Sequence, residues 1–148
     1  MTDYQELIQT LRHAGMRITH QRIAICRLLC ETDDHPTAAK IYAHLKPQFP
    51  SLSLATVYNT LEVLVELGMV SALGHAGDDN VHYDADTTPH INLACLICHR
   101  VVDAGLPPVH NLSAEISQAS GYKLLGSRLM YYGICPACQT LQTQKNHN

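Results

Sequence analysis

The chain has 148 residues, with 10 Lys and Arg, 13 Asp and Glu, and a formal net charge of -3. This balance excludes a polycation that coats nucleic acid through bulk charge. Residues 1–9 lack the basic start and apolar stretch of a secretory signal, and no apolar run approaches the ~18 residues that cross a bilayer. We therefore expect a cytoplasmic protein with one ordinary domain or two small ones.

Apolar residues recur at spacings of three and four in the first half of the chain, which predicts short helices. Start and stop signals support them, because Thr19 and Ser53 can cap helices, Pro36 suits a first turn, and Gly15 and Gly68 can end helices. The expected helices cover residues 3–13, 19–33, 35–45 and 53–68.

After the last of these helices the apolar period changes to two. Residues 69–73 and 81–83 flank a turn rich in glycine and aspartate, which predicts a hairpin. Short helices followed by a two-stranded wing make a winged helix-turn-helix. We therefore expect residues 1–84 to form a winged-helix DNA-binding domain.

The remaining residues predict a second, small α/β domain, which makes the expected fold class α+β. A polar connector of residues 85–90 leads into this domain, residues 91–138. Its expected elements are strands at 91–96 and 100–103, a helix at 111–120 and a long strand at 122–133. An exposed strand can pair across a twofold axis, so we expect a dimerisation domain and a homodimer. Residues 139–148 are polar and predict a frayed tail.

Four of the six cysteines form two Cys-x-x-Cys pairs, which are Cys95 with Cys98 and Cys135 with Cys138. The two-residue gap lets both sulfurs of a pair face one ion at about 2.3 Å, and two pairs complete a tetrahedron. A reducing cytosol also favours thiolates over disulfides. The sequence therefore predicts one structural Zn²⁺ ion, whereas Cys26 and Cys30 are expected to be small, buried or half-buried residues on an apolar helix face.

The alternative for the second pair is a catalytic dithiol, because Cys135-Pro-Ala-Cys138 resembles an oxidoreductase motif in isolation. A thioredoxin-like pair should follow a strand and begin a helix, whereas we expect this pair to precede a polar tail. A closed four-cysteine zinc site also leaves no open coordination position for catalysis. We therefore expect a protein that is not an enzyme, with a zinc-stapled thiol-redox protein as the rival from another class.

Several motifs occur in an order that resembles the ferric uptake regulator (Fur) family. Residues 53–61 are similar to the recognition helix of that family, and they are preceded by the motifs at 16–22 and 35–38. The motifs that follow are His82-Tyr83-Asp84, His90-Ile91-Asn92 and the two cysteine pairs. The resemblance covers about residues 5–138. It implies a homodimeric repressor that binds an inverted-repeat operator in double-stranded DNA only when a regulatory metal fixes the spacing of its DNA-binding domains.

The resemblance also implies a regulatory metal site. Its ligands, carried over motif by motif, are His35, Asp84, His90, Asn92 and Asp103. Two imidazoles, two carboxylates and an amide oxygen suit Fe²⁺ or Mn²⁺. Taken singly, His35 could cap a helix and Asp84 could end a strand. Asn92 departs from the family pattern, which commonly has a second histidine there, and a neutral amide either weakens the site or does not ligate.

The DNA interface and the signal follow from the same resemblance. The implied DNA contacts are Arg17, Arg22, Ser53, Ala55, Thr56, Tyr58 and Asn59. Asp84 and Asp103 resemble the peroxide-sensing (PerR) branch of the family. In that branch bound Fe²⁺ would react with hydrogen peroxide and His35 or His90 would be oxidised, which would release the metal and the operator. The alternative within the family is an iron- or manganese-responsive repressor.

Overall fold

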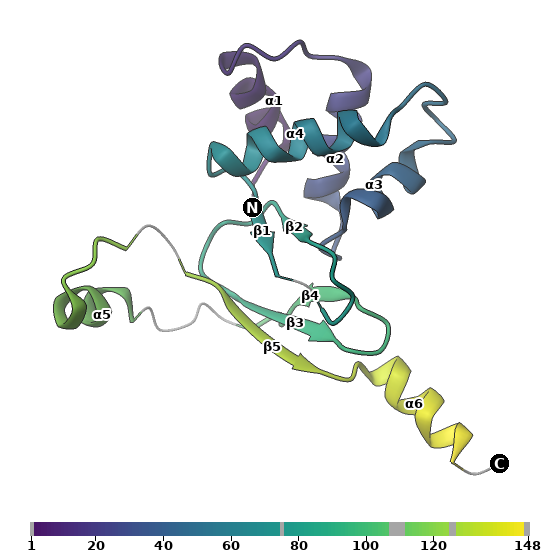
Figure 1. The fold of residues 1–148 in the computed structure, drawn as a ribbon, viewed down its shortest axis with the longest axis vertical. Helices are drawn as coiled ribbons and strands as arrows, with labels where there is room; N and C mark the ends of the chain where they lie inside the picture. The colour runs from purple at the N-terminus through teal and green to yellow at the C-terminus, as the bar shows by residue number, and fades with distance from the viewer. Residues whose placement is uncertain (1, 75, 107–111, 125–126, 147–148) are drawn as a thin grey trace.

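The computed structural model describes residues 2–74, 76–106, 112–124 and 127–146. Within these residues, four helices pack together at one end, and two small sheets with two further helices form the other end (Figure 1). The helices of the first end are α1 (Tyr4–His13), α2 (His20–Glu31), α3 (Ala38–Leu45) and α4 (Leu54–Glu66).

Each of these four helices begins at a side-chain cap. Thr19, Thr37 and Ser53 each accept a hydrogen bond from the backbone N–H three residues further on, at 3.1 to 3.2 Å. Asp3 caps α1 in the same way through the N–H of Gln5. A cap of this kind contributes about 1 kcal/mol to stability. The predicted caps of the second and fourth helices are therefore confirmed.

The main hydrophobic core lies between the four helices. Its largest fully buried side chains include Leu7, Leu11, Ile25, Ile41, Leu61 and Leu64. In α4 the spacing of three and four points Val57, Leu61 and Leu64 into this core, which leaves Ala55, Tyr58 and Asn59 on the exposed face. The helix face that is free for a partner is thus fixed by the packing of the opposite face.

The strands form two separate sheets. The hairpin pairs β1 (Ser71–Leu73) with β2 (His82–Asp84) in antiparallel register. The three-stranded sheet has the order β4-β3-β5, with β3 (Ile91–Cys95) antiparallel to β4 (Val101–Asp103) and parallel to β5 (Leu129–Gly133). The crossover between β3 and β5 contains α5 (Ser113–Ser120). None of the described helices is long and apolar enough to cross a membrane.

The segment between α2 and α3 connects the two ends of the molecule. The N–H of His35 donates to the carbonyl of Val101 at 2.8 Å, and Thr37 forms a β-bridge with His82. This segment is therefore extended, and α3 begins only at Ala38. The prediction that the third helix opens at residues 35–37 was wrong, because backbone pairing with two strands holds these residues outside the helix.

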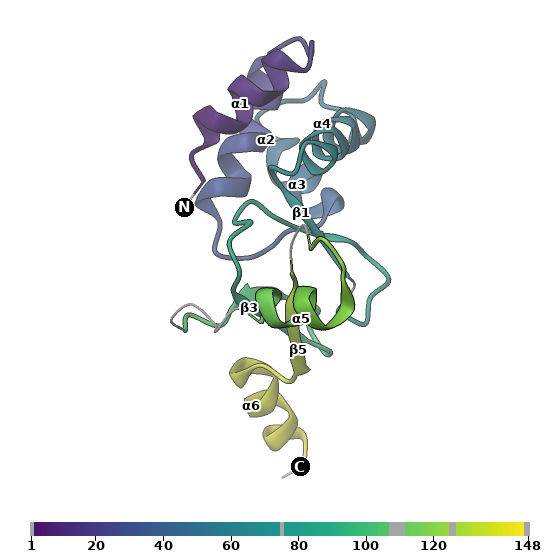
Figure 2. The ribbon, with the colours of Figure 1, turned by 90° about the vertical axis from the view of Figure 1, so that its left-hand side faces the viewer.

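Two other sequence expectations differ from the structure. The expected long strand of residues 122–133 is regular only from Leu129 to Gly133. The expected frayed tail is largely α6 (Pro136–Lys145), which Figure 2 shows extending away from the sheet. Proline at the first helical position and the good helix formers Gln and Lys favour this helix, although it has no continuous apolar face.

Candidate metal centres and nucleic-acid interface

Four ionisable side chains converge where the two ends of the molecule meet. His35 precedes α3, Asp84 ends β2, His90 precedes β3 and Asp103 ends β4. One donor atom from each lies within 4.8 Å of the others. Nε2 of His35 lies 2.7 Å from Oδ1 of Asp103, and Nε2 of His90 lies 2.9 Å from Oδ2 of Asp84 and 3.0 Å from Oδ1 of Asp103.

The neighbouring backbone fixes which atom of each side chain faces this cluster. Nδ1 of His90 donates to the carbonyl of Thr88 at 2.6 Å, so Nε2 carries the free lone pair in the neutral ring. Oδ1 of Asp84 accepts from the N–H of Asp86 at 2.8 Å, which leaves Oδ2 for the cluster. Outer hydrogen bonds of this type are what orient ligands around a metal ion.

The donor set fits a cation because several of its polar atoms are otherwise unsatisfied. Among the described residues, Oδ2 of Asp84, Nε2 of His90 and Oδ1 of Asn92 are buried without a hydrogen-bond partner. Nε2 of His90 and Oδ2 of Asp84 lie 2.9 Å apart and can pair only when His90 is protonated, whereas Oδ1 of Asn92 has no partner among these residues in either state. Buried polar atoms are normally paired, so with a neutral His90 the three atoms together indicate a missing bonding partner. A divalent cation would satisfy all three atoms at once.

Asn92 lies beside the four-residue cluster. It pairs with Asp103 in the antiparallel register of β3 and β4, so both side chains are on the same face of the sheet. It is only 3% exposed, and it lines a small cavity together with Asp84 and His90. The structure therefore brings all five predicted regulatory ligands to one place.

Burial and charge alter the acid–base properties of the cluster. Burial raises the pKa of Asp84, and the neighbouring His35 partly offsets this effect. Burial opposes the charge on His90, but the Thr88 carbonyl and the carboxylates of Asp84 and Asp103 outweigh it and raise its pKa above the usual 6.5. Without a cation, a proton on His90 is therefore the favoured counter-charge for the two carboxylates.

The four cysteines of the two pairs form the second cluster. Their sulfurs lie within 4.8 Å of one another, and those of Cys98 and Cys135 are 3.8 Å apart. A tetrahedron with bonds of about 2.3 Å places its corners ~3.8 Å apart, so this geometry fits zinc. Burial opposes ionisation of Cys95, yet the N–H of Cys135 and the N–H groups of its own turn lower its pKa to about 6.

The expectation that a polar tail, and not a helix, follows the second cysteine pair was wrong. Cys135 lies two residues after the end of β5 and occupies the N-cap position of α6, which is the strand-to-helix setting of a redox pair. Convergence of the other pair on the same point is the stronger argument, because a four-cysteine cluster is the arrangement that binds structural zinc.

The two remaining cysteines fit the expected structural role. Cys26 is fully buried in α2, and burial raises its pKa to about 12. Burial also raises the pKa of Cys30, to about 11. A thiol with such a pKa is almost entirely protonated near neutral pH, and the thiolate is the reactive form.

The residues expected to contact DNA fall into two groups. Ala55, Tyr58 and Asn59 lie on the exposed face of α4, and Arg17 is exposed before α2. Ser53, Thr56 and Arg22 instead have partners within the chain. Ser53 caps α4 through the N–H of Thr56 at 3.1 Å, and the hydroxyl oxygens of these two residues lie 2.9 Å apart. Arg22 donates to the carbonyl of Arg17.

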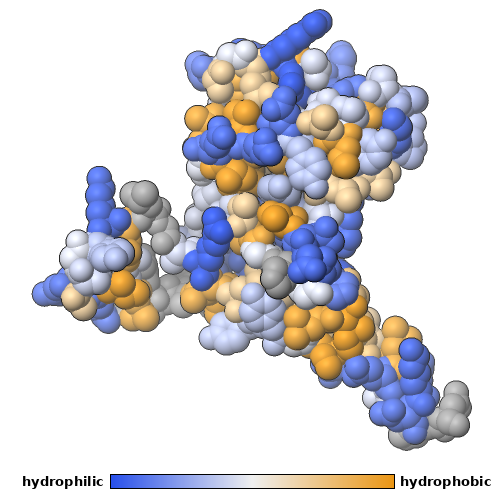
Figure 3. All heavy atoms as spheres, in the orientation of Figure 1, coloured by the Kyte–Doolittle hydropathy of each residue, from blue (hydrophilic) through white to orange (hydrophobic). Residues whose placement is uncertain are grey.

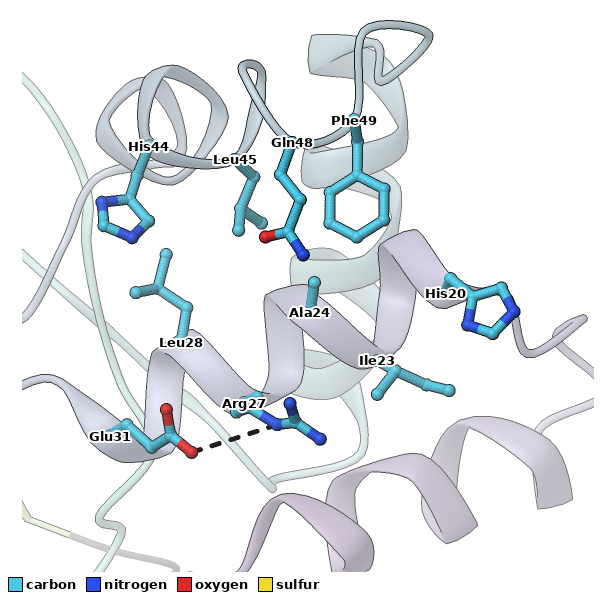
Figure 4. Close-up of a pocket in the computed structure, with 10 residues that line it drawn as sticks. All are labelled: His20, Ile23, Ala24, Arg27, Leu28, Glu31, His44, Leu45, Gln48 and Phe49. Carbon is cyan, nitrogen blue, oxygen red and sulfur yellow. Dashed lines mark ion pairs between the residues drawn. The ribbon is translucent and has the colours of Figure 1, made fainter.

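A hollow of about 440 Å³ lies between α2 and α3. Figure 4 shows Arg27 and Glu31 joined by an ion pair, at 4.0 Å, along one wall, with His20 and His44 far apart at opposite ends. The polar side chains do not converge on one point, so this hollow lacks the donor geometry of the two clusters.

His82 is a residue that the sequence analysis did not assign. It is fully buried, and its Nδ1 donates to the carbonyl of His35 at 2.8 Å. The sequence contains one signal for it: His82 and Asp84 are two residues apart in a strand, so their side chains point to the same face. Its contact with the backbone of a predicted ligand required the fold.

The fold and the two clusters define a winged-helix protein with two sets of side chains suited to metal ions. The model of the ferric uptake regulator family matches residues 13–132, and the chain belongs to that family. The peroxide-responsive repressor PerR of Staphylococcus aureus (strain USA300) is 37% identical over 137 residues, which cover 93% of this chain and 92% of that protein. The resemblance stated from the motifs is thus confirmed.

Solved structures agree with this assignment. PerR from Streptococcus pyogenes, whose structure was described in terms of peroxide sensing and gene regulation, is 39% identical with a TM-score of 0.53, covering 94% of this chain and 95% of that chain. The Vibrio cholerae ferric uptake regulator is 27% identical with a TM-score of 0.67, covering 86% and 98% of the two chains.

Proposed function

We propose that this chain is a metal-dependent DNA-binding transcriptional repressor that senses hydrogen peroxide through a regulatory Fe²⁺ site. The observation that carries the proposal is the convergence of His35, Asp84, His90 and Asp103, which come from both ends of the molecule. A cation bound by all four would join the DNA-binding domain, residues 1–84, to the dimerisation domain, residues 91–138. Its loss would free the two domains to reorient.

The ligand set is proposed as His35, Asp84, His90, Asn92 and Asp103, with the four cysteines holding Zn²⁺ separately. The regulatory set contains no thiolate, and its nitrogen and oxygen donors suit Fe²⁺ and Mn²⁺. The orphaned Oδ1 of Asn92 supports a role for this amide oxygen as the fifth donor.

DNA recognition is proposed for the exposed start of α4. Tyr58, Asn59 and Ala55 would face base edges, while Arg17 and the N-terminal end of the helix would face phosphates. Ser53 and Thr56 would then act chiefly by holding the start of the helix in place, because their hydroxyls pair with each other. Arg22 would do the same for the flank of the helix through its bond to the Arg17 carbonyl.

A homodimer is proposed through the sheet of the second domain. Strand β5 lies at the edge of that sheet, and its exposed apolar side chains are Leu129, Tyr131 and Tyr132. Figure 3 shows hydrophobic residues gathered on the surface near the place where β5 leads towards α6. A twofold dimer would present two α4 helices to the two halves of an inverted repeat.

Fe²⁺ held by the regulatory ligands would activate hydrogen peroxide, so that one peroxide oxygen would be added to a neighbouring imidazole and the other would leave as water. His35 and His90 are the two imidazoles in the cluster. Once oxidised, either ring would be a poorer donor, and the contact between the domains would weaken. The proposed function therefore uses a ligand of the site as the sensing group.

Mass spectrometry of the iron-loaded protein after mild peroxide tests this function. We expect one added oxygen on a peptide that contains His35 or His90, together with loss of operator binding in a gel shift. The Mn²⁺-loaded protein is the matched control and should remain unmodified and bound to DNA. Unmodified histidine peptides accompanied by oxidised cysteines would instead support the thiol-redox protein, for which the strand-to-helix setting of Cys135 is the relevant observation.

An iron- or manganese-responsive repressor is the second candidate, because the same donor set binds either ion. The Vibrio cholerae ferric uptake regulator, at 27% identity, shares the fold. Operator binding that depends on Fe²⁺ or Mn²⁺ but survives peroxide would favour this candidate. In neither case do we propose an enzymatic reaction, since the peroxide-responsive repressor similar to this chain is a regulator.

A further inference from the structure

Residues 76 and 77, in the loop between β1 and β2, contact the turn that carries the first cysteine pair. Ala76 in this loop is fully buried in a small cluster with Leu73, Ala94 and Val101. Nδ1 of His99, the residue after Cys98, donates to the carbonyl of Ala76 at 2.9 Å. Figure 1 shows the hairpin lying directly over the β3–β4 strands, so this contact joins the wing to the sheet.

The loop and the cysteine turn approach each other closely at Gly77. A Cβ added to Gly77 would meet Cδ2 of Leu96 at 3.4 Å and Nδ1 of His99 at 3.8 Å. Gly77 has a φ of +83°, so the absence of a side chain allows both the loop conformation and the close approach. The loop is thus shaped to rest on the cysteine turn.

His99 has an unusual backbone for its residue type. Its φ is +62°, in the left-handed region that glycine adopts freely and other residues disfavour. Among the described residues the other non-glycine residue with positive φ is Asp79, which lies in the same loop that His99 contacts. Strained backbone conformations persist where the surroundings hold them, and they gather at functional places. We relate this backbone conformation to the hydrogen bond that the His99 imidazole donates to the Ala76 carbonyl.

The far end of the same loop reaches the regulatory cluster. Oδ1 of Asp78 accepts from the N–H of Ala76 at 3.3 Å, and its Oδ2 lies 3.5 Å from Nε2 of His82. Nδ1 of the fully buried His82 then donates to the carbonyl of His35 at 2.8 Å. Contacts therefore lead from the cysteine turn through this loop to a regulatory ligand, and the middle step is a close approach of Asp78 to His82 without a hydrogen bond, because Nε2 of His82 has no hydrogen-bond partner among the described residues.

We propose that His99 is a positioning residue whose imidazole holds the wing loop on the cysteine turn and so keeps His82 and His35 in place for the regulatory cation. The proposal rests on the proposed function, because it concerns the same regulatory site. The turn that carries Cys95 and Cys98 would then help to bind zinc and would also help to position the ligands of the regulatory site. The domains are then joined by this contact as well as by the regulatory cation.

The test compares His99→Gly with Asp79→Gly in the full, zinc-loaded protein. Glycine relieves the positive-φ backbone in both variants, but only His99→Gly removes the imidazole from Ala76. The two readouts are amide hydrogen exchange of residues 76–82 and the affinity for Mn²⁺ in a titration. Zinc content and thermal melting are measured alongside to follow the cysteine site and the fold.

We expect His99→Gly to keep its zinc and to melt close to the wild type, because relief of the positive-φ backbone offsets the lost hydrogen bond to Ala76. Exchange at residues 76–82 should become faster, and Mn²⁺ affinity should fall by about tenfold, as for other residues that orient metal ligands. Asp79→Gly should leave the Mn²⁺ affinity unchanged.

Wild-type Mn²⁺ affinity in His99→Gly, or unchanged exchange at residues 76–82, would overturn the proposal. Loss of zinc from that variant would also overturn it, because His99 would then serve the cysteine site alone. The exchange measurement requires neither operator nor Mn²⁺. A failure of the proposed DNA-binding function, seen as no operator binding by the wild type, is therefore distinguishable from a failure of this inference.

Discussion

The amide of Asn92 is buried, and its Oδ1 has no hydrogen-bond partner among the described residues. A buried unsatisfied polar group costs the folded state about 1–3 kcal/mol. A cation at this oxygen would offset that cost, so Asn92 should have opposite effects on the metal-free and metal-loaded protein. A residue that merely filled space would show no such reversal.

We expect Asn92→Leu, a change of similar volume, to raise the free energy of unfolding of the protein without regulatory metal by about 1 kcal/mol. The same substitution should weaken Mn²⁺ binding by about tenfold or more, because one oxygen donor is lost. Denaturant unfolding and a Mn²⁺ titration measure the two effects. An unchanged Mn²⁺ affinity would show that Asn92 does not ligate, and Asn92→His should strengthen binding if it does.

The titration of His90 gives a prediction about pH. Its folded pKa is raised above 6.5, so its charged form stabilises the metal-free protein below pH 6.5, and this stability is lost as pH rises through the folded pKa. Mn²⁺ binds the neutral ring, so its affinity should instead rise with pH, by up to about tenfold per unit below the folded pKa.

The measurement is thermal melting and Mn²⁺ titration between about pH 6 and 8. The melting temperature without regulatory metal should fall across this range in the wild type relative to His90→Gln, while the Mn²⁺ affinity should rise. Parallel slopes for the wild type and His90→Gln would rule out His90 as the group that the cation and the proton share.

At the scale of elements, α4 presents its exposed face to a partner and depends on Ser53 for its first turn. Ser53 accepts from the N–H of Thr56 at 3.1 Å, and the two hydroxyl oxygens lie 2.9 Å apart. Capping and DNA contact are therefore alternative reasons for serine at this position. They can be separated, because aspartate caps a helix as well as serine does but repels phosphate.

We expect Ser53→Ala to lower the free energy of unfolding by about 1 kcal/mol through loss of the cap. Ser53→Asp should leave stability close to that of the wild type but weaken operator binding at saturating Mn²⁺. Chemical denaturation and gel shifts measure the pair, and Thr19→Ala in α2 serves as a capping control. Equal operator affinity for Ser53→Asp and the wild type would place Ser53 away from the phosphates.

Some of the helix starts and ends could be predicted from the sequence, and others could not. The caps at Thr19 and Ser53 and the stop at Gly68 are local interactions, so residue types alone indicate them. The start of α3 was predicted too early, because the φ of Pro36 suits both a helix and an extended chain. The hydrogen bond from His35 to the distant Val101 decides between them. The local signal that was missed is Thr37, which caps the helix.

At the two metal sites, likewise, some features could be predicted from the sequence and others required the fold. The ligands of the regulatory cluster were predicted from the order of short motifs, and the cysteine cluster from the spacing of its pairs. The structure brings the His, Asp and Cys donors of each set together. The fold was needed to show that Oδ1 of Asn92 has no hydrogen-bond partner among the described residues and that Nδ1 of His82 donates to the carbonyl of His35. Spacing in sequence likewise could not show that Cys135 begins a helix, because that helix has no continuous apolar face.

At the scale of the whole molecule, the four-cysteine cluster closes the second domain from its first strand to its last. Cys95 ends β3, and Cys135 follows the parallel strand β5. The described part of this domain has a small core around Ala94 and Val101, with most of β5 and α5 exposed. A core of that size is insufficient by itself, so bound zinc should supply much of its stability.

Removing zinc should therefore act on the whole protein, not on one site. We expect Cys98→Ser to lose zinc, to unfold β3–β5 and to shift a dimer towards monomer, whereas Cys30→Ser in α2 should retain zinc and dimer. Operator binding should be lost at every Mn²⁺ concentration in Cys98→Ser, because adding the regulatory cation cannot restore the dimer. Zinc analysis, light scattering and gel shifts measure these effects. If Cys98→Ser remained a zinc-free dimer that bound operator with Mn²⁺, the cysteine cluster would not be the staple that the small core of this domain requires.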